Sequence, residues 1–240
     1  MKVLVFIAGV LDPKWPVETV DGALPQRTPE RLILSPFDEA ALEMALALRD
    51  ADPSTSIRAT VAGAADASKL ARAVAAFNVP VATIQVPNWW DQNVVAAALS
   101  SVATDTDLIL MGREFGDCDD GVVPSLVAAR LKRPLLARAQ AVRGRKVMRE
   151  VVSAEEWLTL DRRLVVSVTN DRRTRLRKPL MKNVVQARQA TIHELPAFEA
   201  ESGSELVAVR VLAGCRTPVE CQFITGSPDE QAERLAEMLT

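Results

Sequence analysis

The stretch that decides the fold runs from Asp107 to Leu131 and reads DLILMGREFGDCDDGVVPSLVAARL. Its first part is a short apolar run ending at Gly112, which is typical of a buried strand that reaches the edge of a sheet. Its last part predicts a helix, with Pro124 in the first turn and Asp119 or Asp120 as the cap. An acidic loop joins the two. Such a unit places backbone N–H groups at the carboxyl end of a sheet, where α/β proteins bind nucleotides.

The preceding residues alternate between strand and helix in the same way. Strands are expected at Lys2–Val10, Arg31–Leu34, Ser56–Ala62 and Val81–Val86. Helices are expected at Pro36–Arg49, Asp66–Phe77 and Asp91–Ala103. Ser35 is a natural N-cap for the first of these helices, with Pro36 at its first position. This alternation predicts an α/β fold with a doubly wound, mostly parallel sheet and right-handed crossovers.

After residue 131 the alternation of strands and helices ends. Four strands without an intervening helix are expected at Leu135–Val142, Lys146–Ser153, Glu156–Asp161 and Leu164–Asn170. They predict an antiparallel extension over residues 135–170. Residues 171–190 are markedly basic. We therefore expect a nucleotide-binding domain at 1–195 and a C-terminal arm at 196–240, with a strand at Leu206–Leu212 and a helix at Pro228–Leu239.

Composition narrows the class of protein. The net charge of −2 over 240 residues argues against nucleic-acid binding. The three cysteines form no Cys-x-x-Cys pair, so neither a zinc site nor a disulfide framework is indicated. The apolar N-terminus, Met1–Leu11, is interpreted as a strand rather than a signal peptide. No run is long enough to span a membrane, so a cytoplasmic protein is expected. The single histidine, His193, has no triad signature around it.

The loop after Gly112 matches neither a Walker loop nor a Gly-x-Gly-x-x-Gly fingerprint. Its carboxylates would repel a phosphate, but they suit ribose hydroxyls and helix capping. From spacing alone, nucleotide binding and an ordinary strand–helix turn both remain open.

One motif resembles a known family. Ser35–Ala45, SPFDEAALEMA, is similar to the Asn-Pro-Phe-Asp-Glu-x-Ala-Val-Glu-Glu-Ala signature of electron transfer flavoprotein β subunits. Lys2–Pro13 resembles the opening of that family, and Met111–Asp119 resembles its nucleotide loop. Leu206–Val209, Arg216–Val219 and the closing helix resemble its C-terminal arm. The resemblance implies an adenine nucleotide α-hydrolase-like, Rossmann-like fold.

The resemblance also implies a function. The family forms a heterodimer with an α subunit, which holds most of the FAD, and the C-terminal arm of this chain would pack on that subunit. The β subunit buries a structural AMP, or a second FAD in electron-bifurcating members. The dimer is an electron carrier rather than an enzyme. It accepts electrons from a flavin dehydrogenase and passes them to a quinone oxidoreductase or another acceptor.

Carried over position by position, the resemblance implies a set of cofactor-binding residues. They are Ala8, Pro13, Ser35, Pro36, Phe37, Asp38, Ala62, Gly63, Ala64, Gly112, Arg113, Asp117, Cys118, Asp119, Asp120, Gly121, Val122 and Val123. Pro13 falls where the first loop approaches the flavin. The family's basic pair late in the first strand is replaced by Ala8-Gly9, and Glu114 replaces a glutamine. These departures favour AMP over a second FAD, and an empty or altered site is the third alternative.

The basic segment aligns with the region that anchors the partner dehydrogenase in the family. The implied recognition residues are Arg175, Arg177, Lys178, Met181 and Lys182, with Met181 as the anchor. The segment predicts an acidic partner, and a merely solvated basic face is the alternative.

Two other classes share the predicted sheet. A universal-stress-type nucleotide-binding regulator would need a glycine-rich phosphate run, which this sequence lacks. An adenylate-forming or pyrophosphatase enzyme would need a Ser-Gly-Gly-x-Asp-Ser loop after the first strand, and Gly9–Asp12 does not supply it.

Overall fold

A computed structural model describes residues 1–15, 22, 28–63, 67–152, 154–161, 163–198, 203–205, 207–210 and 223–238. The chain divides into two units, which are described separately. The larger unit comprises Met1–Glu18 and Pro25–Val207, and the smaller comprises Thr19–Leu24 and Ala208–Thr240. Among the described residues, the helices all lack the length and apolar character that a bilayer crossing requires.

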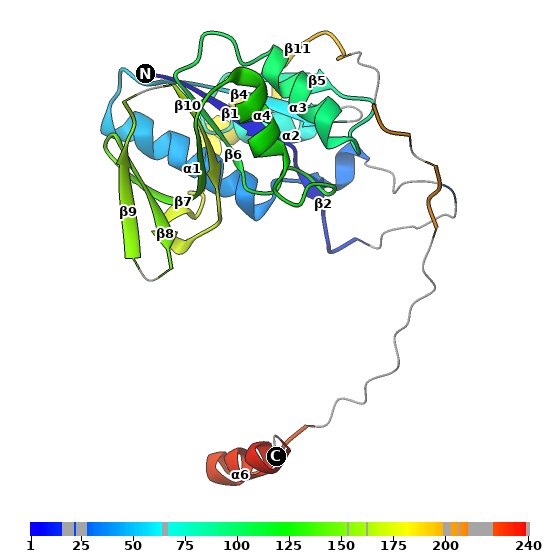
Figure 1. Cartoon of the computed structure of the whole chain (residues 1–240), viewed down its shortest axis with the longest axis vertical. Helices are drawn as coiled ribbons and strands as arrows, with labels where there is room; N and C mark the ends of the chain where they lie inside the picture. Colours follow the sequence, from blue (N-terminus) through cyan, green and yellow to red (C-terminus); the bar gives the residue numbers. More distant parts are fainter. Residues whose placement is uncertain are drawn as a thin grey trace. The chain divides into compact units, whose positions relative to one another are not determined.

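The described part of the larger unit is built on a nine-stranded sheet (Figure 1), with the strand order β11-β5-β4-β1-β6-β10-β7-β8-β9. Its strands are β1 (Lys2–Ile7), β4 (Ser56–Gly63), β5 (Val81–Gln85), β6 (Leu108–Gly112), β7 (Leu135–Arg143), β8 (Lys146–Val151), β9 (Ala154–Thr159), β10 (Leu164–Val168) and β11 (His193–Glu194). The strands from β11 to β7 in this order pair in parallel, and β8 and β9 continue the sheet antiparallel. A separate pair joins β2 (Val10–Leu11) to β3 (Leu32–Ile33). The predicted α/β class with a mostly parallel sheet is confirmed.

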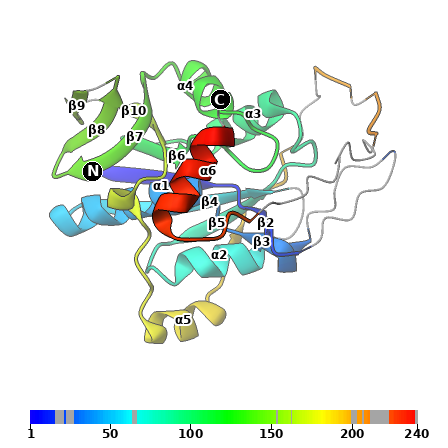
Figure 2. The ribbon, with the colours of Figure 1, turned by 90° about the horizontal axis from the view of Figure 1, so that it is seen from below.

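Helices cover both faces of the sheet (Figure 2). They are α1 (Pro36–Ala51), α2 (Ser68–Ala75), α3 (Gln92–Ser101), α4 (Val123–Leu131) and α5 (Met181–Arg188), with 3-10 turns η1 (Pro29–Arg31) and η2 (Arg172–Thr174). Alternation along β1 separates two cores. Val3, Val5 and Ile7 pack with α1 and α2, whereas Leu4 and Phe6 pack with α3 and α4. A strand buried on both faces is typical of a parallel sheet.

The predicted antiparallel extension is wrong for its last strand. Leu164–Asn170 was expected to continue the hairpins, but β10 lies between β6 and β7 and runs parallel to both. The physical reason is burial: all five residues of β10 are buried. A strand that is apolar on both faces is stable in the middle of a covered sheet, and the β8–β9 hairpin takes the place of a crossover helix.

Several other predictions can be compared directly. The helices expected at Asp66–Phe77 and Asp91–Ala103 are present as α2 and α3, one or two residues shorter at each end. The segment now seen as α5 was predicted only as a basic stretch. In the smaller unit, α6 (Pro228–Met238) matches the expected final helix. Of the strand expected at Leu206–Leu212, residues 207–210 are described and do not form a strand. Leu206, Val211, Leu212 and the Arg216–Val219 motif lie outside the described residues.

The start of α1 is fixed by a buried carboxylate. Ser35 and Asp38 form a capping box in which each side chain accepts a hydrogen bond from the other's backbone N–H. Asp38 also accepts from the backbone N–H groups of Ala8 and Gly9, at 3.3 and 3.0 Å. Burial raises the pKa of Asp38, and these hydrogen bonds partly offset the rise. One side chain therefore ties the end of β1 to the first turn of α1.

Gly9 is required at this junction for two reasons. Its φ of +67° lies in the left-handed region, which favours glycine. A Cβ added here would lie 2.5 Å from Cδ2 of Leu70 and 3.0 Å from the carbonyl oxygen of Ile33. The chain can therefore turn from β1 into β2 while its N–H still reaches Asp38.

We expect Asp38→Ala to lower the free energy of unfolding of the full chain by about 3 kcal/mol, because it removes the acceptor of three buried backbone N–H groups and breaks one half of the capping box. Urea denaturation followed by circular dichroism measures the change. The control is Asp105→Ala, which removes an exposed carboxylate paired with Lys2. Equal denaturation midpoints for Asp38→Ala and the control would contradict the role given to Asp38.

Candidate functional site

The predicted site residues converge at one edge of the sheet. Ala8 follows β1, Gly63 ends β4 and Gly112 ends β6, and these three strands are parallel neighbours. The chain leaves β1 towards β4 on one side and later returns to β6 on the other. This edge is therefore a topological switch point, where open α/β sheets bind their ligands.

The two predicted motifs contact each other at this edge. A Cβ added to Gly112 would lie 2.8 Å from Cβ of Phe37, so the end of β6 and the first turn of α1 approach closely. The guanidinium carbon of Arg113 lies 5.2 Å from the centre of the Phe37 ring, within the range of a cation–π contact. Arg113 also forms an ion pair with Glu114. The Ser35–Asp38 motif and the loop after Gly112 are thus parts of one structure.

Asp119 holds this loop in place. Its carboxylate, which is buried, accepts hydrogen bonds from the backbone N–H groups of Phe115, Gly121, Val122 and Val123 at 2.7–3.1 Å. Of the two caps that the sequence allowed for α4, Asp119 is therefore the one used.

The neighbouring residues of the loop have different roles. Asp117 accepts from the N–H of Leu11, and Gln92 at the start of α3 donates to the carbonyl of Cys118. Asp120 is exposed. Gln92 was not predicted, and only its place next to the Asp91 cap marks it in the sequence. Two of the loop's acids thus act as hydrogen-bond acceptors for the backbone.

This arrangement decides which parts of a nucleotide the edge suits. The N–H groups of Gly121, Val122 and Val123, which lead into α4 and could attract a phosphate, are already bonded to Asp119. Val123 packs in the core, and Val122 is exposed. The small buried residues Ala8 and Ala62, together with exposed carboxylates such as Asp120, fit a base and ribose hydroxyls better than they fit a phosphate.

Two predicted residues lie away from this cluster or cannot be placed. Pro13 is exposed, two residues beyond β2. Ala64 lies outside the described residues.

The basic recognition segment lies elsewhere, from η2 to α5. Met181, the predicted anchor, is 76% exposed at the start of α5, and Arg175, Lys178 and Lys182 are also exposed. Arg177 is exposed as well, but its guanidinium is paired with carboxylates of α1.

The guanidinium of Arg177 is engaged within the chain. It donates to the carboxylates of Glu43 and Asp50 on α1, and these hydrogen bonds raise its pKa. Its positive charge is therefore used to hold the segment against α1.

We expect Asp119→Ala to destabilise the full chain by about 2 kcal/mol, because it frees several N–H groups and removes the N-terminal cap of α4. Amide hydrogen exchange at Phe115–Val123 should accelerate. Asp120→Ala is the matched control, since the adjacent carboxylate is exposed and should leave the exchange of these amides unchanged. Unaltered exchange in Asp119→Ala would rule out the capping role.

Comparison with known proteins identifies the family. Residues 27–200 match the family model described as the electron transfer flavoprotein domain. The chain is also 30% identical over 118 residues to the caffeyl-CoA reductase-Etf complex subunit CarD of Acetobacterium woodii. That alignment covers 46% of this chain and 45% of the relative, so the chain spans about half the length of the curated relative it matches. With nearly three quarters of its length matched by the family model, the chain belongs to the electron transfer flavoprotein domain family.

Proposed function

We propose that this chain is the β subunit of a heterodimeric electron transfer flavoprotein. The observation that carries the proposal is the contact between Ser35–Asp38 and the loop after Gly112 at the switch point of the sheet. In the proposed dimer the FAD is held mainly by an α subunit, and this chain covers part of it. The dimer acts in the cytoplasm as an electron carrier, accepting electrons from a flavin dehydrogenase and delivering them to a quinone oxidoreductase or another acceptor.

A structural AMP in this chain is part of the proposal. The base and ribose would lie against Ala8, Ala62 and the loop after Gly112, with exposed carboxylates near the ribose hydroxyls. The phosphate would need to displace Asp119 from the N–H groups of α4 or bind further along the loop. A second FAD carries two phosphates and is therefore disfavoured. The role of AMP is to fill and stiffen this edge rather than to react.

Nucleotide content tests the proposal. We expect the chain, co-expressed with its α subunit, to purify as a yellow heterodimer that releases one FAD and one AMP upon denaturation. Chromatography of the released nucleotides with absorbance detection gives the ratio. Two FAD per dimer would make the chain a bifurcating-type subunit, and a stable dimer with no adenine nucleotide besides FAD would refute the AMP site.

The donor dehydrogenase is proposed to dock on α5. Leu180, Met181 and Val185 are all more than half exposed, and cations flank them. A few exposed apolar side chains surrounded by charge are typical of an anchor in a transient interface. The charges that remain for an acidic partner are those of Arg175, Lys178 and Lys182, because Arg177 is paired with α1.

We expect Met181→Asp to slow reduction of the heterodimer's FAD by its donor dehydrogenase at least about tenfold, the effect of losing an interface anchor. Stopped-flow absorbance of the flavin gives the rate. The control is Val152→Asp, which changes a fully exposed apolar residue between β8 and β9. Equal rates for the two variants would place the donor elsewhere, whereas flavin content should be unchanged in both.

A further inference from the structure

The larger unit contains a concave site away from the switch point. It is a cavity of about 690 Å³ between α1, α2, α5 and the segment that leads into α5. We call it the α2–α5 pocket. Among the residues that the structure describes, its lining includes none of the positions predicted to bind a cofactor. Its volume is within the range of small-molecule sites in proteins, roughly 300–1,000 Å³.

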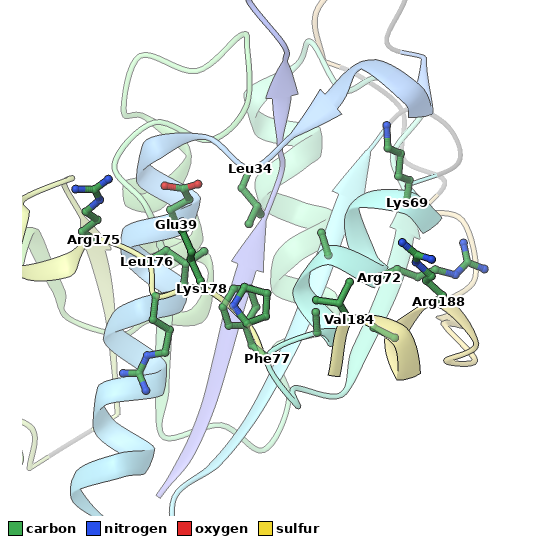
Figure 3. A pocket seen from close by; sticks show the side chains of 15 residues that line it. Leu34, Glu39, Lys69, Arg72, Phe77, Arg175, Leu176, Lys178, Val184 and Arg188 are labelled. Carbon is green, nitrogen blue, oxygen red and sulfur yellow. The ribbon is translucent and has the colours of Figure 1, made fainter. Parts of the chain in front are cut away.

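The walls of the α2–α5 pocket are apolar. Phe77 is 8% exposed and lies in the middle of the pocket in Figure 3. Leu34, Leu176, Val184 and Ala187 complete an aliphatic surface around it. An aliphatic or aromatic group can therefore be buried here against side chains of α5 and of the segments before α1, after α2 and before α5.

The rim of the pocket is strongly cationic. Lys69, Arg72, Arg175, Lys178 and Arg188 contribute positive charges around the apolar wall (Figure 3). Glu39 is the one acid among the described residues that line the pocket, and the charge of Arg175 partly offsets the rise that burial causes in its pKa. Arg177 also lines the pocket, but its charge is compensated by α1. The net positive charge favours an anion.

Arg72 gives the most specific indication of a ligand. Its Nε is buried and, within the part of the chain that the structure describes, has no hydrogen-bond partner. Leaving a buried donor without a partner is unfavourable, and a bound acceptor is one way to satisfy it. Arg188 lines the same pocket from α5, which packs against α2. A carboxylate or phosphate reaching these two guanidinium groups would form charge-assisted hydrogen bonds.

We propose that the α2–α5 pocket binds a small amphipathic anion, with its apolar body against Phe77 and Leu176 and its carboxylate or phosphate at Arg72 and Arg188. A free phosphate lacks the apolar body, and a neutral lipid leaves Arg72 unpaired. The pocket is formed by one chain, so this inference does not depend on the proposed α subunit or on electron transfer.

The pocket also shares α5 with the proposed docking surface. Val184, Ala187 and Arg188 face the pocket, whereas Met181 and Val185 are exposed outside it. A bound anion would contact the face of α5 that lines the pocket and neutralise part of the positive charge there, such as that of Arg188. The ligand is thus placed to modulate docking, because Arg175 and Lys178 line the pocket and also carry charge of the docking surface.

Calorimetric titration of the full chain with octyl phosphate tests the proposal, with octanoate, inorganic phosphate and octanol as comparison ligands. We expect octyl phosphate or octanoate to bind in a one-to-one ratio and at least about tenfold more tightly than inorganic phosphate or octanol. The stronger of the two anions identifies the headgroup. The absence of saturable binding by both anions would overturn the proposal.

Variants locate the binding. We expect Arg72→Met and Arg188→Met each to weaken binding at least about tenfold, and Ala73→Trp, on the exposed surface of α2, to abolish it by filling the pocket. Arg130→Met removes an exposed arginine from α4 and is the matched control, for which affinity should not change. Circular dichroism confirms that each variant is folded. Equal affinities in the pocket variants and the control would overturn the assignment to this pocket.

Discussion

The larger unit depends on the buried carboxylate of Asp38. It accepts hydrogen bonds from the backbone N–H of Ser35, the N-cap of α1, and from those of Ala8 and Gly9, so the start of a helix and the end of the central strand share one acceptor. Because α1 packs on β1, β6 and β7, the position of its first turn also affects how these three strands are covered. Close contact between Gly112 and Phe37 then fixes the loop after β6 to the same point. The geometry of this edge follows from the polar junction at Asp38, together with the buried carboxylate of Asp119 that holds the loop after Gly112.

Features with local causes could be predicted from the sequence. Ser35, Pro36 and Asp38 specify the start of α1 by their own chemistry, and the apolar run before Gly112 specifies β6. The position of β10 could not be predicted, because the same residues could form a strand parallel or antiparallel to its neighbours. Burial on both faces of the sheet determines which of the two arrangements forms. The sequence predicts Asp119 or Asp120 as a cap of α4. It does not predict how many backbone N–H groups donate to Asp119, because that number depends on the path of the loop. The α2–α5 pocket was missed altogether, because its walls come from segments far apart in the chain.

Charge is used in two different ways in this molecule. In the loop after Gly112, Asp117 and Asp119 accept hydrogen bonds from the backbone, so an acidic sequence does not produce an equally acidic surface. Along residues 171–190 only some of the cations are compensated: Arg173 pairs with Asp171 and Glu155, and Arg177 pairs with Glu43 and Asp50. A count of charges along the sequence therefore overstates both the negative field at the switch point and the positive field near α5.

The insertion of β10 between β6 and β7 has a consequence for how the chain folds. The strands on either side of it are synthesised first, and the β8–β9 hairpin separates β7 from β10 in the chain. The middle of the sheet therefore stays open until Leu164–Val168 have left the ribosome. Pairing between distant segments is slow, and unpaired apolar edges invite aggregation. Until that late step, the nascent chain exposes the edges of β6 and β7 to other chains, and a chaperone that binds extended apolar segments would act there.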